Sequence, residues 1–345
     1  MSTRPVLSVF LLLALSIGSA FALASDLYTG ESALAVDERA GATALARALD
    51  EVLVRLTGEV GDSLVDRFGL ADSQLRLLVL SEQRVRRQRS DAEGSGLREE
   101  VRLQVDFDPQ GVDALLAERN LPRLGRERPS ILLWLAVESA EGIGLDADPA
   151  LEADIAEQAR RLGLDIVRPL GDLQDLAEIE AIDIRGGFLD SAEPSALRYG
   201  AGLIAMLDLR QTQAGWEGRW FWRLEGRDAG LQSPASSREQ ALSAGMERLL
   251  ATLVDRFGVL PGLEGGTRRI LVEGIDEEVQ YAEVVRYLSS LSVVADLRVM
   301  AARDNRVDFE LDLTGPGFED ALAIGAVLDV IDRRADGALI VRLAR

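Results

Sequence analysis

The chain has 345 residues and a formal net charge of −20, and it contains no histidine, cysteine or lysine, so all 38 of its basic residues are arginine. This composition excludes Ser-His-Asp and Cys-His catalysis, Schiff bases, the lysine of phosphate-binding loops, disulfides and ordinary zinc sites. The negative charge repels phosphate backbones, so no nucleic acid is expected as a partner. Carboxylate chemistry stays open, chiefly glycoside hydrolysis or an all-oxygen cation site. No motif points to a cofactor or a metal ligand.

The first 24 residues have the pattern of a secretory signal peptide. Arg4 precedes an apolar run over residues 6–24 that closes on small residues. We predict cleavage between Ala24 and Ser25, with Ala22 as a second possible end of the signal, and hence export to the periplasm. The run is also just long enough to cross a membrane, so an uncleaved signal would anchor the protein in the inner membrane. Membrane contact is expected only in that case.

Two stretches rich in proline and glycine, at residues 121–129 and 260–266, divide the exported chain into three small mixed modules. We place these modules at residues 25–122, 129–259 and 267–345. Together they predict a protein of the α/β and α+β classes.

The first module is predicted to be α+β. A strand at residues 26–36 precedes a long amphipathic helix that ends at Gly58, and a hairpin over residues 84–107 precedes a helix that begins at Pro109. The apolar face of the long helix contains Leu45, Leu49, Val52, Leu53 and Leu56. The hairpin carries Arg84, Arg86, Arg87 and Arg89. These arginines either attract an anionic partner or form a solvated strand edge paired with acidic residues, and we favour the edge.

The middle module is predicted to be mixed α/β. An apolar strand at residues 131–137 is followed by a helix and a second short strand over residues 149–167. Such a βαβ unit is typical of parallel strands. A hairpin over residues 203–224 follows, and then a helix that Ser236 and Glu239 cap reciprocally.

An acidic segment lies between the βαβ unit and this hairpin. Its carboxylates are Asp172, Asp175, Glu178 and Glu180. Leu173, Leu176 and Ile179 recur at helical spacing among them and are predicted to face inward. We interpret the carboxylates as the solvated face of a helix rather than as a catalytic dyad.

The last module has the order βαββαβ, which predicts a ferredoxin-like sandwich. Its strands are predicted at residues 270–272, 293–300, 307–313 and 338–343, and its first helix at residues 276–291. The second helix is predicted to have an apolar face made of Phe318, Ala321, Leu322, Gly325 and Leu328.

One strand of the middle module carries a candidate binding surface. Trp216, Trp220 and Trp222, three of the four tryptophans of the chain, lie with Leu224 at even positions of this strand. In a strand, residues at even positions point to the same face. The tryptophan face either stacks on sugars or packs beneath the helices of its own module, and packing is the favoured interpretation. Phe221, with Arg219 and Arg223 on the same face, is then the candidate for binding a partner.

Several segments resemble the proteobacterial domain of unknown function family 2066. They are the signal, the Leu27-Tyr28 strand, residues 39–58, the Arg198-Tyr199 segment and the hairpin over residues 216–222. The resemblance would cover nearly all of the mature chain. It implies an exported protein and supplies no functional residue.

Two hypotheses about function follow. The first is a non-enzymatic interaction or assembly protein of the bacterial cell envelope, whose partner is an envelope protein or a glycan. It follows from the absence of the usual nucleophiles and of cofactor motifs. The alternative is a carboxylate-dependent glycan hydrolase of the periplasm, with the tryptophan strand as a sugar subsite.

Overall fold

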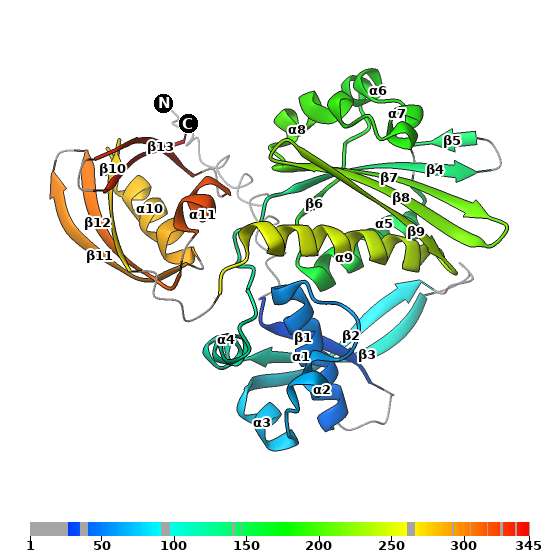
Figure 1. Ribbon diagram of the computed structural model, residues 1–345, viewed down its shortest axis with the longest axis horizontal. Helices are drawn as coiled ribbons and strands as arrows, with labels where there is room; N and C mark the ends of the chain where they lie inside the picture. The colour runs from blue at the N-terminus through cyan, green and yellow to red at the C-terminus, as the bar shows by residue number, and fades with distance from the viewer. Residues whose placement is uncertain are drawn as a thin grey trace, which may run out of the picture.

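The computed structural model describes residues 27–34, 41–90, 97–139, 142–145, 147–260, 266–291, 293–303, 305–315, 317–324, 327–334 and 337–344. These residues form three sheets, each with its own helices (Figure 1). The predicted mixture of α/β and α+β modules is confirmed. No helix among the described residues has the length and hydropathy to span a bilayer. The predicted signal, with its cleavage site between Ala24 and Ser25, lies outside them.

The N-terminal module is an antiparallel sheet of order β1-β3-β2 that is covered by α1. Its elements are β1 (Thr29–Ala33), α1 (Ala42–Thr57), α2 (Leu64–Phe68), α3 (Asp72–Leu77), β2 (Val79–Ser90), β3 (Leu97–Phe107) and α4 (Pro109–Glu118). The apolar face predicted for α1 is buried, and Gly58 ends the helix in the left-handed conformation, with φ 67°. Asp108 caps α4, and Pro109 is its first residue.

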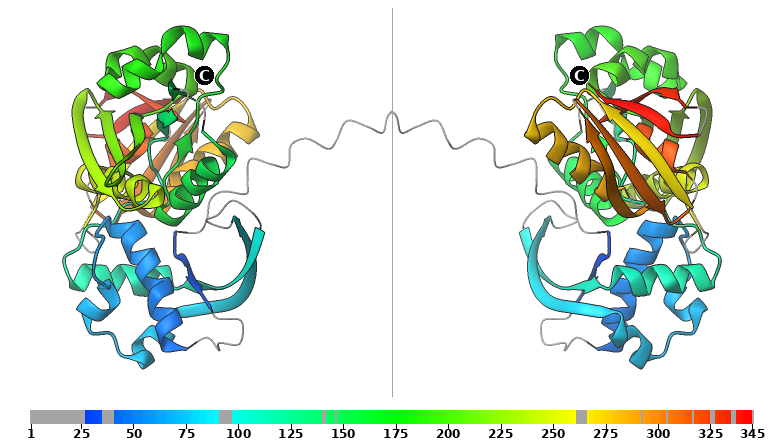
Figure 2. Two further views of the ribbon diagram at one scale, coloured as in Figure 1. Left: turned by 90° about the vertical axis from the view of Figure 1, so that its right-hand side faces the viewer. Right: turned by 90° about the vertical axis from the view of Figure 1, so that its left-hand side faces the viewer.

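The predicted hairpin of this module is β2 with β3. The two strands curve together past α1 (Figure 2). β2 lies at the edge of the sheet, and its Arg87 stands opposite Glu100 of β3. The arginines of β2 therefore lie on a sheet edge, as predicted.

The middle module is a six-stranded sheet with helices on both faces. Its strand order is β5-β4-β7-β8-β9, and β6 pairs with β4. The strands are β4 (Ile131–Ser139), β5 (Gly142–Gly144), β6 (Ile166–Val167), β7 (Leu203–Thr212), β8 (Gly215–Leu224) and β9 (Arg227–Ala235). The helices are α5 (Pro149–Leu162), α6 (Leu173–Glu178), α7 (Ala181–Gly186), η1 (Leu189–Ala192), α8 (Glu193–Tyr199) and α9 (Arg238–Phe257). The predicted βαβ unit is confirmed, since β4 is parallel to β6.

Two details of this module differ from the prediction. β9 was not predicted, because its first four residues are exposed and it has no continuous apolar face. The N-cap of α9 is Ser237, whose Oγ accepts the backbone N–H of Gln240, instead of the predicted pair Ser236 and Glu239. The shift arises because β9 runs to Ala235, so Ser236 still belongs to the turn.

The two faces of the middle sheet carry different layers. α5 and α9 pack on one face, and α9 lies between the sheet and the N-terminal module (Figure 1). The segment from α6 to α8 covers the opposite face, away from the N-terminal module. We call this second layer, residues 173–199, the α6–α8 layer.

The tryptophan face of β8 packs against α9, as the favoured interpretation predicts. Trp220 is completely buried, and its Nε1–H donates to the carbonyl of Ala241 at 3.2 Å. Trp222 and Leu224 are buried in the same core. Gly245 of α9 lies directly over the Trp220 ring, which allows the helix to approach the sheet closely.

Gly245→Ala should therefore destabilise the protein, although alanine normally favours a helix by about 1 kcal/mol over glycine. The new Cβ would overlap the ring of Trp220, which is buried and hydrogen-bonded and cannot move aside cheaply. We expect a loss of about 1–3 kcal/mol in the free energy of unfolding, measured in urea. Arg248→Ala, at an exposed position of the same helix, is the control and should change it by less than about 0.5 kcal/mol. A stabilised Gly245→Ala variant would show that α9 does not pack this closely.

The C-terminal module is a five-stranded sheet of order β11-β12-β10-β14-β13 with two helices. Its elements are β10 (Thr267–Glu273), α10 (Glu278–Ser290), β11 (Val294–Arg303), β12 (Arg306–Leu313), α11 (Phe318–Ile324), β13 (Leu328–Arg333) and β14 (Leu339–Leu343). The predicted βαββαβ order is thus extended by one strand, β13, and the ferredoxin-like sandwich is not confirmed, because β14 lies parallel to β10 rather than antiparallel. The second helix was predicted to reach Leu328, but α11 ends at Ile324 and Leu328 begins β13. The β-branched residues Val330 and Ile331 favour a strand there.

Arg55 and Arg128 join the N-terminal module to the middle module. Arg55 is fully buried on α1, where its Nη1 donates to the carbonyl of Thr29 at 2.8 Å and its Nε to that of Arg161 at 3.0 Å. Its Nη2 forms an ion pair with Glu51 at 2.7 Å. One guanidinium thus ties β1 and α1 to the end of α5.

Arg128 completes this joint from the connecting segment. Its Nη1 donates to the carbonyls of Leu162 and Gly163, at 2.9 and 2.8 Å, and its Nη2 donates to the carbonyl of Arg55 at 2.9 Å. Burial, together with the charge of Arg55, lowers the pKa of Arg128 to about 9. Both guanidinium groups thus satisfy carbonyl groups that the contact between the modules buries.

Candidate functional site

The predicted binding residues of β8 lie beneath the α6–α8 layer. Phe221 is half-buried, and a Cβ added to Gly187 of this layer would lie 2.7 Å from the phenylalanine ring. Arg219 pairs with the buried Asp208 at 3.1 Å and also donates to the carbonyl of Arg185. These side chains hold the α6–α8 layer on the sheet.

Arg223, near the end of β8, links this strand to the same layer. Its Nη1 lies 2.6 Å from Asp190 and 2.6 Å from Glu193, and its Nε lies 2.5 Å from Asp228. We predicted that Phe221, Arg219 and Arg223 bind a partner molecule, and the structure does not test this prediction. Within the described residues, all three side chains already contact groups of the protein itself.

A buried carboxylate organises the α6–α8 layer from within. Asp175 is fully buried: its Oδ1 pairs with Arg198 at 2.9 Å, and its Oδ2 accepts the hydroxyl of Tyr199 at 2.7 Å. Asp172 caps α6 and also pairs with Arg198, whose hydrogen bond holds the pKa of Asp172 well below its usual range. These contacts link α6 to α8.

The orientation predicted for this segment was therefore wrong for Leu173, Leu176 and Asp175, whereas Ile179, just after α6, is buried as predicted. Asp175 points inward, whereas Leu173 is 88% exposed and Leu176 is also exposed. The reason lies in the surface beneath the helix, where Arg198 and Tyr199 bind a carboxylate. Helical spacing alone cannot reveal that an acidic side chain is bound by arginine from another helix.

The outer surface of the α6–α8 layer is unusually apolar. Its exposed apolar side chains, with Leu170 just before α6, are Leu170, Leu173, Leu176, Ile182, Phe188 and Leu197. Leu197 of α8 is 86% exposed and Leu170 is 76% exposed. Single exposed apolar residues are ordinary, but a group of them on one small layer is typical of an interaction site. Sequence reasoning missed this group because Leu173 and Leu176 had been assigned to the core, and no pattern singled out the others.

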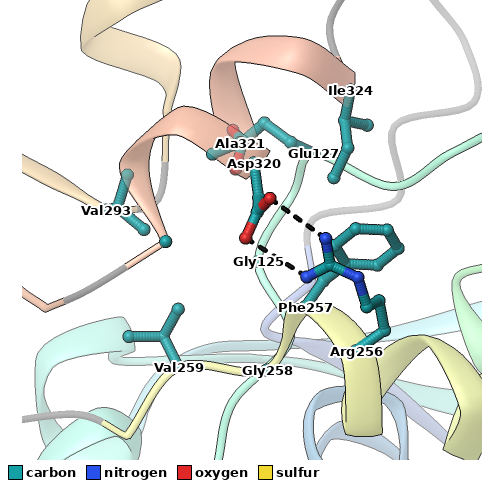
Figure 3. Close-up of a pocket in the computed structure, with 11 residues that line it drawn as sticks. Gly125, Glu127, Arg256, Phe257, Gly258, Val259, Val293, Asp320, Ala321 and Ile324 are labelled. Atoms are coloured by element: carbon teal, nitrogen blue, oxygen red, sulfur yellow. Dashed lines mark hydrogen bonds and ion pairs between the residues drawn. The ribbon is translucent and has the colours of Figure 1, made fainter.

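The junction between the middle and C-terminal modules contains a small pocket of about 210 Å³ (Figure 3). Arg256 at the end of α9 points across it to Asp320 of α11, 3.1 Å away, and also pairs with Glu225 at 2.7 Å. The volume is below the roughly 300–1,000 Å³ of ordinary ligand pockets. We therefore regard this pocket as a joint between modules.

A larger groove of about 640 Å³ runs along α5. Two carboxylates, Glu152 and Asp165, line it. Glu152 forms an ion pair with Arg168 at 3.2 Å, and Asp165 accepts a hydrogen bond from the hydroxyl of Ser130. We call this feature the α5 groove.

Comparison with known families corrects the resemblance inferred from sequence. A family model described as Domain of unknown function (DUF8605) matches residues 22–125, whereas no match to family 2066 is found. The inferred membership of family 2066 was wrong, because short helical and hairpin patterns without a diagnostic motif recur in unrelated proteins. The matched segment corresponds to the N-terminal module and the connection after it.

The whole chain has little similarity to proteins of known structure or function. No curated protein matches the chain. Among solved structures, the crystal structure of TolB from Acinetobacter baumannii is similar at 12% identity and a TM-score of 0.21, covering 44% of this chain and 33% of that chain. The chain thus spans about a third of the length of that structure. A TM-score this low supports no conclusion about fold or function.

Proposed function

We propose that this protein is a non-enzymatic interaction protein of the bacterial cell envelope that binds a partner protein on the α6–α8 layer. The observation that carries the proposal is the group of exposed apolar side chains around Leu173 and Leu197. Interfaces concentrate their binding energy in a few such apolar side chains that lose water on binding.

The layer presents these leucines on a fixed support. Arg198 pairs with both Asp172 and Asp175, so α6 and α8 are held together. On the sheet side, Ile184 and Leu189 of the layer are buried in a core with Met206 of β7. A surface that is ordered before binding loses less conformational entropy when it binds a partner.

The charge of the layer indicates the kind of partner. Residues 173–199 contain six carboxylates and two arginines, and Asp172 at the N-cap of α6 adds a seventh carboxylate. Exposed leucines within an acidic surrounding are complementary to a basic segment with an apolar stripe, such as an amphipathic helix. The proposed partner is therefore a different protein that presents such a segment, because a second copy of this acidic layer would be repelled.

The proposed compartment and the absence of catalysis rest on the sequence. The signal pattern of residues 1–24 supports export to the periplasm. The composition lacks the residues of the common nucleophile and base pairs. In the α5 groove, an ion pair with Arg168 already engages Glu152, one of the two carboxylates that a glycosidase would need there.

Photo-crosslinking tests this proposal. A photoreactive amino acid in place of Leu173 should give a discrete adduct with another envelope protein in cells. The peptide joined to it should carry arginine or lysine beside apolar residues at helical spacing. Adding Leu197→Ser should reduce the adduct by about tenfold, because the neighbouring apolar contact is lost.

Leu77 of α3 provides the matched control. It is 81% exposed and lies in the N-terminal module. The photoreactive residue at position 77 should give no discrete adduct, and Leu77→Ser should leave the adduct from position 173 unchanged. Three results would contradict the proposal: an adduct with a second copy of the chain, an adduct with an acidic peptide, and the absence of any protein adduct.

A further inference from the structure

The α5 groove combines an apolar floor with a length that suits a hydrocarbon chain. One face of α5 lines it, through residues 152, 155, 156, 159 and 160. Leu164, Ile166 and Leu27 extend the apolar part of its wall. At 1.5 Å per residue, the stretch from residue 152 to residue 160 is about 12 Å long. The groove volume of about 640 Å³ lies within the range of ordinary ligand sites.

The groove is basic, although the chain as a whole is acidic. Four arginines line it, namely Arg126, Arg128, Arg160 and Arg168, against the two carboxylates Glu152 and Asp165. The whole chain has 58 acidic and 38 basic residues, so this balance is reversed among the residues that line the groove, although Glu157 and Glu31 pair with Arg160 from outside the lining. A cluster of one sign in a concave site attracts ligands of the other sign.

Two of these arginines keep a donor available. Arg168 uses its Nε for Glu152 and its Nη1 for the carbonyl of Leu133. Arg160 uses its Nε and Nη2 for Glu157, both at 2.9 Å. Within the described residues, Nη2 of Arg168 and Nη1 of Arg160 have no hydrogen-bond acceptor from the protein. Both side chains are partly exposed, so these donors are accessible to a ligand.

Arg128 adds positive charge that no carboxylate of the groove neutralises. The acceptors of its guanidinium are carbonyl oxygens, including those of Leu162 and Gly163. Burial, and to a lesser extent the charge of Arg55, lowers its pKa, so the charged form of Arg128 is stabilised less than it would be in water. An anion bound nearby would stabilise that charge.

We propose that the α5 groove binds a single-chain amphiphile with an anionic head group. The hydrocarbon chain lies along Ile155, Ala156 and Ala159, and the carboxylate or phosphate head accepts hydrogen bonds from Arg160 or Arg168. Guanidinium groups bind both kinds of head with paired N–H donors. This site is separate from the α6–α8 layer, which covers the opposite face of the middle sheet.

Calorimetric titration of the purified protein with decanoate, below its micelle concentration, tests the proposal. Decanoate should bind with one site per chain. Decyltrimethylammonium has the same chain length and the opposite charge, and should bind at least about tenfold more weakly. Titration with decyl phosphate then identifies the preferred head group. Whichever of decanoate and decyl phosphate binds with the higher affinity has the head group that the groove prefers.

Two variants on α5 give the matched comparison. Ala156→Trp places a large side chain in the groove at an exposed position and should weaken decanoate binding by at least about tenfold. Ala153→Trp adds the same side chain at an exposed position of α5 outside the groove lining and should leave binding unchanged. Circular dichroism and thermal unfolding establish that both variants are folded.

Three outcomes would overturn the inference. They are no binding of decanoate or decyl phosphate, equal binding of the cationic amphiphile, and equal affinity in the two folded tryptophan variants. The second would mean that the arginines do not select the ligand, and the third that binding occurs elsewhere. Because no α6–α8 residue is changed, failure here leaves the proposed protein-binding function standing.

Discussion

Arg55→Ala should lower the free energy of unfolding by about 3–5 kcal/mol, the usual cost of breaking a buried ion pair by removing one partner. Arg55 is completely buried and donates to the carbonyls of Leu27, Thr29 and Arg161. Its loss leaves these acceptors without their donor and leaves Glu51 without its counter-ion. Because one of the acceptors belongs to α5, contact between the N-terminal and middle modules should weaken as well. Urea unfolding monitored by tryptophan fluorescence and by circular dichroism measures both effects.

The pH dependence of the same variant provides an internal check. Burial already raises the pKa of Glu51 in the folded protein, and Arg55 opposes this rise. Without Arg55 the folded-state pKa should rise further above the unfolded value of about 4.3. The folded state then binds more protons than the unfolded state, so the variant should recover stability as the pH falls from neutral toward that value.

Arg47→Ala is the matched control for this prediction. Arg47 is an exposed arginine of the same helix, and its loss should change the free energy of unfolding by less than about 0.5 kcal/mol. Equal losses in the two variants would refute the proposed role of Arg55. A loss for Arg55→Ala that grows as the pH falls would contradict the assignment to Glu51.

The second large effect is expected in the C-terminal module. A fragment of residues 267–345 should unfold cooperatively by itself, because all the buried apolar residues of its core lie between Ile270 and Val341. Leu288 of α10 is completely buried in that core. Leu288→Ala should therefore destabilise the fragment by about 2–5 kcal/mol, measured by thermal and urea unfolding.

Arg286→Ala, at an exposed position of the same helix, should stay within about 0.5 kcal/mol of the unmodified fragment. The ion pair between Arg256 and Asp320 is lost in the fragment, but it is partly exposed and contributes little. A fragment without a cooperative transition would mean that the module depends on the rest of the chain. Equal losses from the two substitutions would mean that the assigned helix face is wrong.

Much of the local structure was predictable because its signals act over a few residues. Gly58 ends α1 in the left-handed conformation, and Asp108 caps α4 next to Pro109. The alternation along β8 correctly placed Trp220 and Trp222 in the core. Each of these features depends on backbone geometry or on a strict repeat, which neighbouring residues alone determine.

The candidate sites were not predictable by the same reasoning. Leu173 has the spacing of a core residue, yet it is exposed, while Asp175 has the spacing of a surface residue, yet it is buried. A helix as short as α6 can place either face on the sheet. The choice depended on Arg198 and Tyr199, which are distant in sequence and supply the partners of Asp175.

The sequence by itself determined which reactive residue types the protein lacks and the α/β and α+β character of its modules, and it carries the pattern from which export is predicted. These follow from composition, hydropathy and short-range periodicity, which need no knowledge of distant contacts. Only the tertiary structure decided which charges are buried, which leucines are exposed and where the arginines gather along α5. The physical reason is that burying a charge is favourable only beside its partner, and the partners of Arg55 and Asp175 include residues 23 to 106 positions away.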